Sequence, residues 1–224
     1  AYGMISLSIF FKVQQTTGSI AIAGLATGVN GITGATTAGL RGTLIDKFGM
    51  KIPLRVFAPS YAVLILLFST GNSSTQLVVF AGVLGFSAPP INLSVRPLWK
   101  DLVPHSYLRT AYAFDSAMMS STSVVGPVVV TALALSSRPY LALDVVAALM
   151  FIGGAALALT PVSRNWIPEK KEKGQGSLLR NPVMQLLMFE GCFIGFGWGV
   201  FDVAVPAFAT QENVAHRVAW IFAA

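Results

Sequence analysis

Charged residues are scarce in this sequence. Asp, Glu, Lys and Arg make up 11% of its 224 residues, whereas soluble domains carry about 25%, and hydrophobic residues make up 54%. Several stretches, such as residues 19–40, hold no charged residue and reach the length of about 20 residues that crosses a bilayer as a helix. The composition excludes an ordinary soluble domain and predicts a membrane protein with several transmembrane helices.

Cysteine and histidine are also sparse. The one cysteine, Cys192, excludes an intrachain disulfide framework, and it lies in an apolar run where a small packing residue is expected. The two histidines, His105 and His216, do not cluster with carboxylates, and no glycine-rich loop ends in Lys-Ser or Lys-Thr. The sequence therefore predicts no metal, no other cofactor and no enzyme, because it also lacks a paired catalytic constellation.

The apolar runs predict an all-α transmembrane bundle of about six complete helices with partial first and eighth helices. The expected segments are 1–11, 19–41, 53–70, 76–98, 107–135, 140–160, 182–210 and a start near residue 214. Only about 11 apolar residues precede Lys12, and the last run stops at Ala224. We therefore expect a piece of a longer chain, incomplete at both ends.

Basic residues gather on one side of the predicted helices. That side receives 12 of the 15 Lys and Arg residues, with Arg41 counted among them, and the other side receives Lys12, Arg138 and Arg217. The positive-inside rule places the loops at 42–52, 99–106 and 161–181 in the cytoplasm of a cell whose inner membrane holds the protein. The acidic lipid surface then balances the net charge of +6, so nucleic acid is not an expected partner.

A short charged segment separates the second and third predicted helices. It reads Gly-x-x-x-Asp-Lys-x-Gly-x-Lys, carried by Gly42, Asp46, Lys47, Gly49 and Lys51. The pattern resembles the signature loop of the major facilitator superfamily of secondary transporters, although Met50 stands where the family usually has a basic residue. The resemblance implies a gating loop that helps to hold the cytoplasmic side closed in one state.

A single proline and a proline pair mark expected bends. Gly126 and Pro127 in the fifth helix keep the core of a motif that exporters of the superfamily often carry, and Pro127 is expected to bend the helix. An ordinary kink beside a packing glycine is the alternative. Pro89 and Pro90 predict a break in the fourth helix, which has no basic residue near its start, unlike many proton-coupled drug exporters.

The polar segment 161–181 divides the chain. Its mixture of charges with Gly and Pro predicts a flexible or weakly helical cytoplasmic linker. The resemblance implies that it separates an N-terminal helical half, 1–160, from the start of a C-terminal half, 182–224.

Acids within predicted membrane helices are candidates for function, because charge is costly there. Asp115 is expected to pair with Arg96 or Arg109 as a structural or gating pair, with substrate contact as the alternative. Asp144 is expected to pair with Arg138 at the interface.

Glu190 and Asp202, both in 182–210, are the main proton or substrate candidates. They lie 12 residues apart, about 18 Å along a helix and about 120° apart around it, so both face one pore only if the helix bends. Glycines between them favour a bend. A structural role against later helices remains equally open.

The resemblance implies a secondary active transporter that works by alternating access, with proton-coupled export of a small amphipathic or drug-like molecule. Its partners would be this small molecule, protons and the lipid bilayer. The alternative is a transporter-like structural subunit that packs against other membrane subunits in a larger complex.

Overall fold

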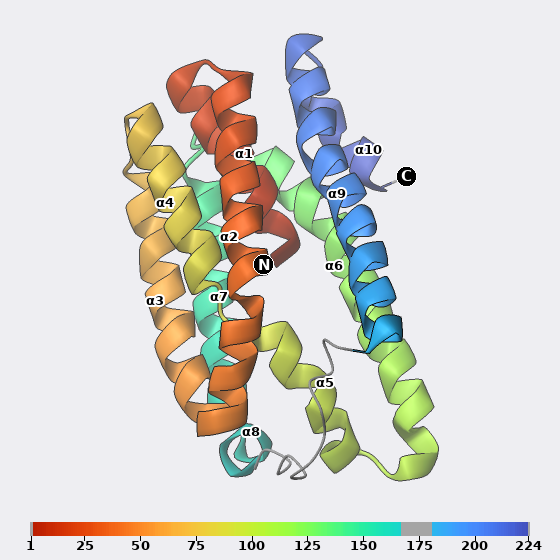
Figure 1. The fold of residues 1–224 in the computed structure, drawn as a ribbon. Coiled ribbons are helices and arrows are strands. Elements are labelled where there is room, and N and C mark those ends of the chain that lie inside the picture. The colour runs from red at the N-terminus through yellow and green to blue at the C-terminus, as the bar shows by residue number, and fades with distance from the viewer. Residues whose placement is uncertain (1, 167–180, 224) are drawn as a thin grey trace.

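The computed structural model describes residues 2–166 and 181–223, and all regular structure in this part of the chain is helical (Figure 1). The helices are α1 (Tyr2–Thr17), α2 (Ile20–Phe48), α3 (Lys51–Ser69), α4 (Ser74–Ser87), α5 (Ile91–Leu102), α6 (Leu108–Ala134), α7 (Leu141–Leu159), α8 (Pro161–Asn165), α9 (Pro182–Gln211) and α10 (Val218–Ala223). Short 3₁₀ turns, η1 (His105–Tyr107) and η3 (Ala215–Arg217), precede α6 and α10. The expectation of an all-α helical bundle is confirmed.

The long helices run up and down the bundle (Figure 1). By length and composition, four helical segments of the described chain are apolar enough to cross a membrane: Lys51–Ser69, His105–Ala134, Leu141–Leu159 and Pro182–Gln211. The 29 residues of α2 extend over roughly 43 Å, which also exceeds a bilayer core, but this helix is rich in Gly and Thr.

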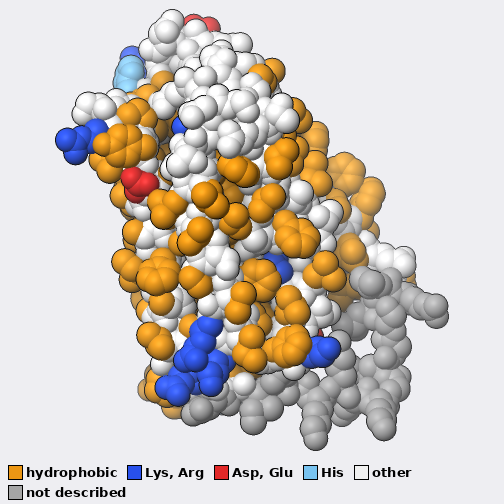
Figure 2. Space-filling model, turned by 90° about the vertical axis from the view of Figure 1, so that its left-hand side faces the viewer, with side chains coloured by type: hydrophobic (Ala, Val, Ile, Leu, Met, Phe, Trp, Pro, Cys, Tyr) orange, Lys and Arg blue, Asp and Glu red, His pale blue; other side chains and the backbone are white. Residues whose placement is uncertain are grey.

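The two ends of the bundle differ in charge. The turn at 49–50, the loop at 103–107 and α8 lie at one end, which we call the basic end, and Figure 2 shows Lys and Arg side chains gathered there below an apolar face. The connections at 18–19, 70–73, 135–140 and 212–214 lie at the far end.

Helix α1 lies at the centre of the packing. Its residues Ile9, Phe10 and Val13 are fully buried, and it contacts α2 and α6 most extensively. Around it, α2 pairs with α4 and α3 pairs with α7. The α3–α7 pair is close because Gly154 lacks a side chain, and a Cβ there would collide with Ala58. Small residues of this kind are what permit close helix packing in lipid.

Several predicted boundaries shift in the structure. Helix α1 continues through Lys12 to Thr17, and α2 continues through the predicted loop to Phe48, so only Gly49 and Met50 form the turn before α3. The expectation of a loop at 42–52 was wrong outside 49–50, because Gly42 does not interrupt α2 and Ile45 of its last turn is buried. The expectation that Gly49 ends the helix is confirmed by its φ of 71° and by its N–H, which donates to the Ile45 oxygen at 2.9 Å.

The predicted break in the fourth helix is present. Helix α4 ends at Ser87, α5 begins at Ile91, and α5 turns away from α4 towards α6 (Figure 1). The start of the predicted linker is helical as α8, which Thr160 caps by accepting the Ser163 N–H, while residues 167–180 of that linker lie outside the described part. Asn181 caps α9 in the same way through the Val183 N–H.

Candidate functional site

The break between α4 and α5 leaves backbone oxygens without helical partners. Pro89 and Pro90 have no N–H, so the i+4 donors for Gly85 and Phe86 are missing. The Gly85 oxygen accepts the Ala88 N–H at 3.4 Å, and side chains of α1 and α2 bind the next carbonyls, at Ala88 and Pro89. The Tyr2 hydroxyl donates to the Pro89 oxygen, and the Arg41 Nη1 donates to the Ala88 oxygen at 2.8 Å. We call Tyr2 and Arg41, with the 88–90 backbone, the break cradle.

Arg41 is not the loop residue that the sequence predicted. It lies inside α2, seven residues or about 10 Å before Phe48, and its Nη2 also donates to the Gly34 oxygen at 2.5 Å. Its buried Nε has no hydrogen-bond partner among the described residues. The C-terminal carbonyls of a helix carry partial negative charge, which explains why a guanidinium is stable beside the end of α4.

Helix α4 is fixed to α2 just before the break. The Asn30 amide donates to the Ala81 oxygen at 2.9 Å, and Thr37 Oγ1 lies 3.4 Å from the Phe86 oxygen while it also donates to the Thr33 oxygen at 2.6 Å. A Cβ at Gly85 would collide with the Thr33 hydroxyl and the Asn30 oxygen. The first side of the break is therefore held closely against α2.

Helix α5, on the second side of the break, is tied to α6 instead. The Arg96 Nε lies 3.1 Å from the Asp115 Oδ2, which is the pairing expected from the sequence with Arg96 as the partner. Asp115 is largely buried, but the Arg96 side chain is 59% exposed, so solvent weakens the pair. A gating role, or contact with substrate, stays a prediction for Asp115. Asp144 makes no ion pair with Arg138 in the described chain, contrary to expectation.

Asp202 lies where α9 packs against α1 and α2. It is half-buried on α9, close to Ser6 of α1. The next residue, Val203, packs against α2. A Cβ placed on Gly24 of α2 would lie only 3.2 Å from the Val203 Cγ1. Pro206 and Ala209 are buried further along α9. We call this contact of α9 with α1 and α2 the α9 seam.

Glu190 lies elsewhere on the same helix. It is exposed, and a Cβ placed on Gly191, Gly195, Gly197 or Gly199 would have no described atom outside the local backbone of α9 within 4 Å. No described helix therefore covers this part of α9, and the structure does not bring Glu190 and Asp202 together. A role for Glu190 in proton or substrate binding stays a prediction.

The two motifs that carried the family resemblance occupy different places. Gly126 and Pro127 are buried where α6 meets α1, and a Cβ at Gly126 would lie 3.1 Å from the Met4 Cγ. This environment supports the packing interpretation of Gly126. The signature segment lies at the basic end, where Asp46 and Lys47 are exposed and the Lys47 ammonium lies 5.3 Å from the centre of the Phe48 ring.

The turn of the signature segment is anchored by neighbouring elements. Ile45, Met50 and Leu54 are buried together with Leu98 of α5. The Trp166 carbonyl, after α8, would lie 3.5 Å from a Cβ at Gly49. The turn thus contacts both the second half of the broken helix and the start of the linker.

Sequence reasoning missed Tyr2, Ser6 and Arg41. Tyr2 and Ser6 fall in an apolar run with no distinguishing spacing, so no sequence signal marked them. Arg41 could have been found from the uncharged run before it, because a cation next to such a run can lie at membrane depth as well as in the loop.

Comparison with known proteins identifies relatives. The sequence matches the family model described as Major Facilitator Superfamily over residues 1–224. It is 29% identical over 218 residues to a protein of Sinorhizobium fredii (strain NBRC 101917 / NGR234) named uncharacterized MFS-type transporter y4rN, an alignment that covers 92% of this chain and 53% of that protein. The chain thus spans about half the length of the curated relative that it matches.

Proposed function

The chain belongs to the Major Facilitator Superfamily, and from this membership we propose that it forms part of a secondary transporter that works by alternating access. In such proteins two helical halves rock around a central substrate site. Here α1 to α7 supply the first half, and α9 begins the second. The cell membrane is the expected location, and a small molecule is the expected substrate.

The observation that carries the proposal is the half-buried position of Asp202 where α9 packs against α1. An acid inside a membrane is costly unless it is paired or used, and this acid lies on the surface where the two halves must separate. Protonation removes its charge and lets α9 pack against α1. Ionisation favours water at the seam and hence its opening. Asp202 would thereby couple proton uptake to the movement of the halves.

The break cradle supplies a second element of this mechanism. Broken helices recur at transporter binding sites, because freed backbone groups are tolerated where protein or a water-filled cavity surrounds them. Helix α4 is fixed to α2, whereas α5 is tied to α6 through Arg96 and Asp115. The break is thus a point at which the two tied pairs of helices can move relative to each other.

Export of a small amphipathic molecule in exchange for protons is the proposed direction and class. Its support is the likeness of Gly126 and Pro127 to the exporter motif. Gly42, Asp46, Lys47, Gly49 and Lys51 would stabilise the closed state at the basic end, where Ile45 and Met50 of the same segment are buried with Leu98 of α5 and a Cβ placed on Gly49 would lie 3.5 Å from the Trp166 oxygen.

Transport by the intact protein in proteoliposomes tests this proposal. With ethidium as the probe, a lumen more acidic than the medium should drive accumulation, and a protonophore should abolish it. Asp202→Asn should lose the gradient-driven accumulation yet retain exchange without a gradient, and Glu190→Gln serves as the matched comparison. If ethidium uptake by the wild type does not depend on the pH gradient, proton-coupled export is contradicted.

A further inference from the structure

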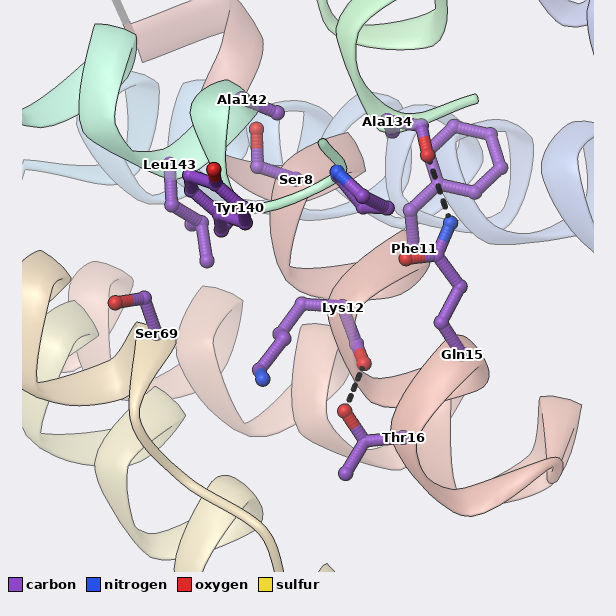
Figure 3. Close-up of a pocket in the computed structure, with 11 residues that line it drawn as sticks. Ser8, Phe11, Lys12, Gln15, Thr16, Ser69, Ala134, Tyr140, Ala142 and Leu143 are labelled. Carbon is purple, nitrogen blue, oxygen red and sulfur yellow. Dashed lines mark hydrogen bonds between the residues drawn. The ribbon is translucent and has the colours of Figure 1, made fainter. Parts of the chain in front are cut away.

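A cavity of about 220 Å³ lies at the far end of the bundle, between α1, the end of α3 and the start of α7 (Figure 3). Water occupies about 30 Å³ per molecule, so the space has room for roughly seven water molecules. No residue of α2, α4 or α9 is among its described lining residues. The far-end cavity is therefore separate from both the break cradle and the α9 seam.

One side of this cavity is polar and the other is apolar. Lys12, Gln15, Thr16 and Ser69 line the polar side, and Phe11, Ala142 and Leu143 contribute apolar surface. In Figure 3 the Lys12 side chain extends into the space between α1 and the end of α3 that carries Ser69. The lining holds a cation but no carboxylate, and Lys12 makes no ion pair within the described chain.

The neighbouring polar groups cannot replace an anion. The Thr16 hydroxyl donates to the Lys12 oxygen at 2.8 Å, and the Ser69 hydroxyl donates to the Leu66 oxygen at 2.7 Å. The Gln15 amide donates to the Ala134 oxygen at 2.9 Å. These groups have already used donors on the backbone, so the oxygens they still present are uncharged acceptors. Lys12, a half-buried residue, thus has hydrogen-bond acceptors nearby but no neutralising charge among the described lining residues.

We propose that the far-end cavity binds a short-chain monocarboxylate, such as propionate. The carboxylate accepts hydrogen bonds from the Lys12 ammonium, and the alkyl group contacts Phe11 and Leu143. A single negative charge matches the single cation of the lining, and hydrogen bonds between charged partners are stronger than neutral ones. A dianion would leave one charge uncompensated, and chloride would leave the apolar side of the cavity unfilled.

Binding to the intact protein, purified in lipid nanodiscs, tests the proposal without any transport measurement. The melting temperature should rise and saturate with sodium propionate, because a ligand that binds only the folded state stabilises it. Sodium chloride at equal ionic strength should have a much weaker effect. Lys12→Met should weaken propionate binding by roughly tenfold or more, the loss expected for a charge-assisted hydrogen bond.

Two further variants make the test decisive. Arg138→Met removes a cation from the same end that does not line the cavity, and it should bind propionate as the wild type does. Ser69→Leu narrows the cavity while Lys12 remains, and it should lose binding even if Lys12→Met fails to fold. Equal saturation by chloride and propionate, an unchanged propionate response in Lys12→Met, or undiminished binding in Ser69→Leu would each overturn the proposal. An unchanged propionate response in Lys12→Met would mean that the Lys12 side chain only extends its ammonium to water and does not bind the carboxylate.

Discussion

Arg41 supplies hydrogen bonds that the backbone lacks where α4 ends. Its guanidinium binds the Ala88 and Gly34 oxygens, and the hydroxyl of Tyr2 serves Pro89 beside it. A carbonyl without a partner is costly in a membrane protein, because lipid offers no replacement donor. Arg41 and Tyr2 together therefore satisfy carbonyls at the point where a double proline separates α4 from α5.

Arg41→Met should lower the free energy of unfolding by about 1–3 kcal/mol, because two carbonyls lose a charged donor. Arg41→Lys should recover part of this loss, since an ammonium can reach one oxygen but cannot bridge two in the fixed geometry of a guanidinium. Reversible unfolding in mixed micelles measures both variants. Arg55, an exposed arginine of α3, provides the control. If Arg41→Met lowers the free energy of unfolding no more than Arg55→Met does, Arg41 does not stabilise the break cradle.

Some residues of the candidate site could be predicted from the sequence and others could not. The acids Glu190 and Asp202 stood out because charge is rare in apolar runs. Which of them contacts another helix depends on the partner surface, and Ser6 lies nearly two hundred positions earlier in the chain. Tyr2 reaches Pro89 across 87 positions and Arg41 reaches Ala88 across 47, distances over which local patterns carry no information.

At the scale of elements, the pairing of α2 with α4 determines where the broken helix lies. The two helices approach so closely because Gly34 and Gly85 face each other, with a Cβ at Gly34 only 3.6 Å from the Gly85 oxygen. Close backbone approach places Asn30 within reach of the Ala81 oxygen. Small residues thus bring the polar groups of the two helices together.

Gly85→Ala should destabilise the protein by about 1–3 kcal/mol, because its methyl group would force the two backbones apart. Gly28→Ala is the matched control on α2, since no described atom outside the local backbone of α2 lies within 4 Å of its Cβ position, and it should be neutral or slightly stabilising. Melting temperatures of the two variants in the same detergent compare them directly. Equal stability in both would show that the α2–α4 contact is looser than described.

Element boundaries were predicted well where a breaker stands in the sequence. The Pro89–Pro90 pair predicted the break, and Gly49 predicted the end of α2. The segment 42–48 was misassigned because its charges resemble a loop, although Leu44 and Ile45 continue the helix and Ile45 is buried against Met50 and Leu98. Packing partners of this kind cannot be read from local composition.

At the scale of the whole molecule, the distribution of basic residues orients the protein. The described helices place the 49–50 turn, η1 and α8 at the same end of the bundle (Figure 1). An excess of Lys and Arg in short loops marks the cytoplasmic side. The basic end should therefore face the cytoplasm.

Cysteine labelling of intact cells checks this orientation. In a Cys192→Ser background, Ser137→Cys at the far end should react with a membrane-impermeant maleimide. Ser106→Cys at the basic end should react only after the cells are permeabilised. Both serines are exposed, so accessibility within the protein does not differ between them. The reverse labelling pattern would invert the topology and with it the proposed direction of transport.

The central claim is that protonation of Asp202 controls the α9 seam. Spin labels at Thr75, near the far end of α4, and at Gln211, the last residue of α9, report the separation of these helices without requiring a known substrate. Both residues are exposed, and Cys192→Ser removes the native thiol.

Distance distributions between these labels, recorded by pulsed electron paramagnetic resonance from pH 5.5 to 8.5, test the claim most directly. The wild type should exchange a short distance for a longer one as the pH rises and Asp202 ionises. Asp202→Asn should keep the short distance at every pH, because an amide stays neutral, and Glu190→Gln should titrate as the wild type does. A pH response that survives in Asp202→Asn, or disappears in Glu190→Gln, would contradict the account.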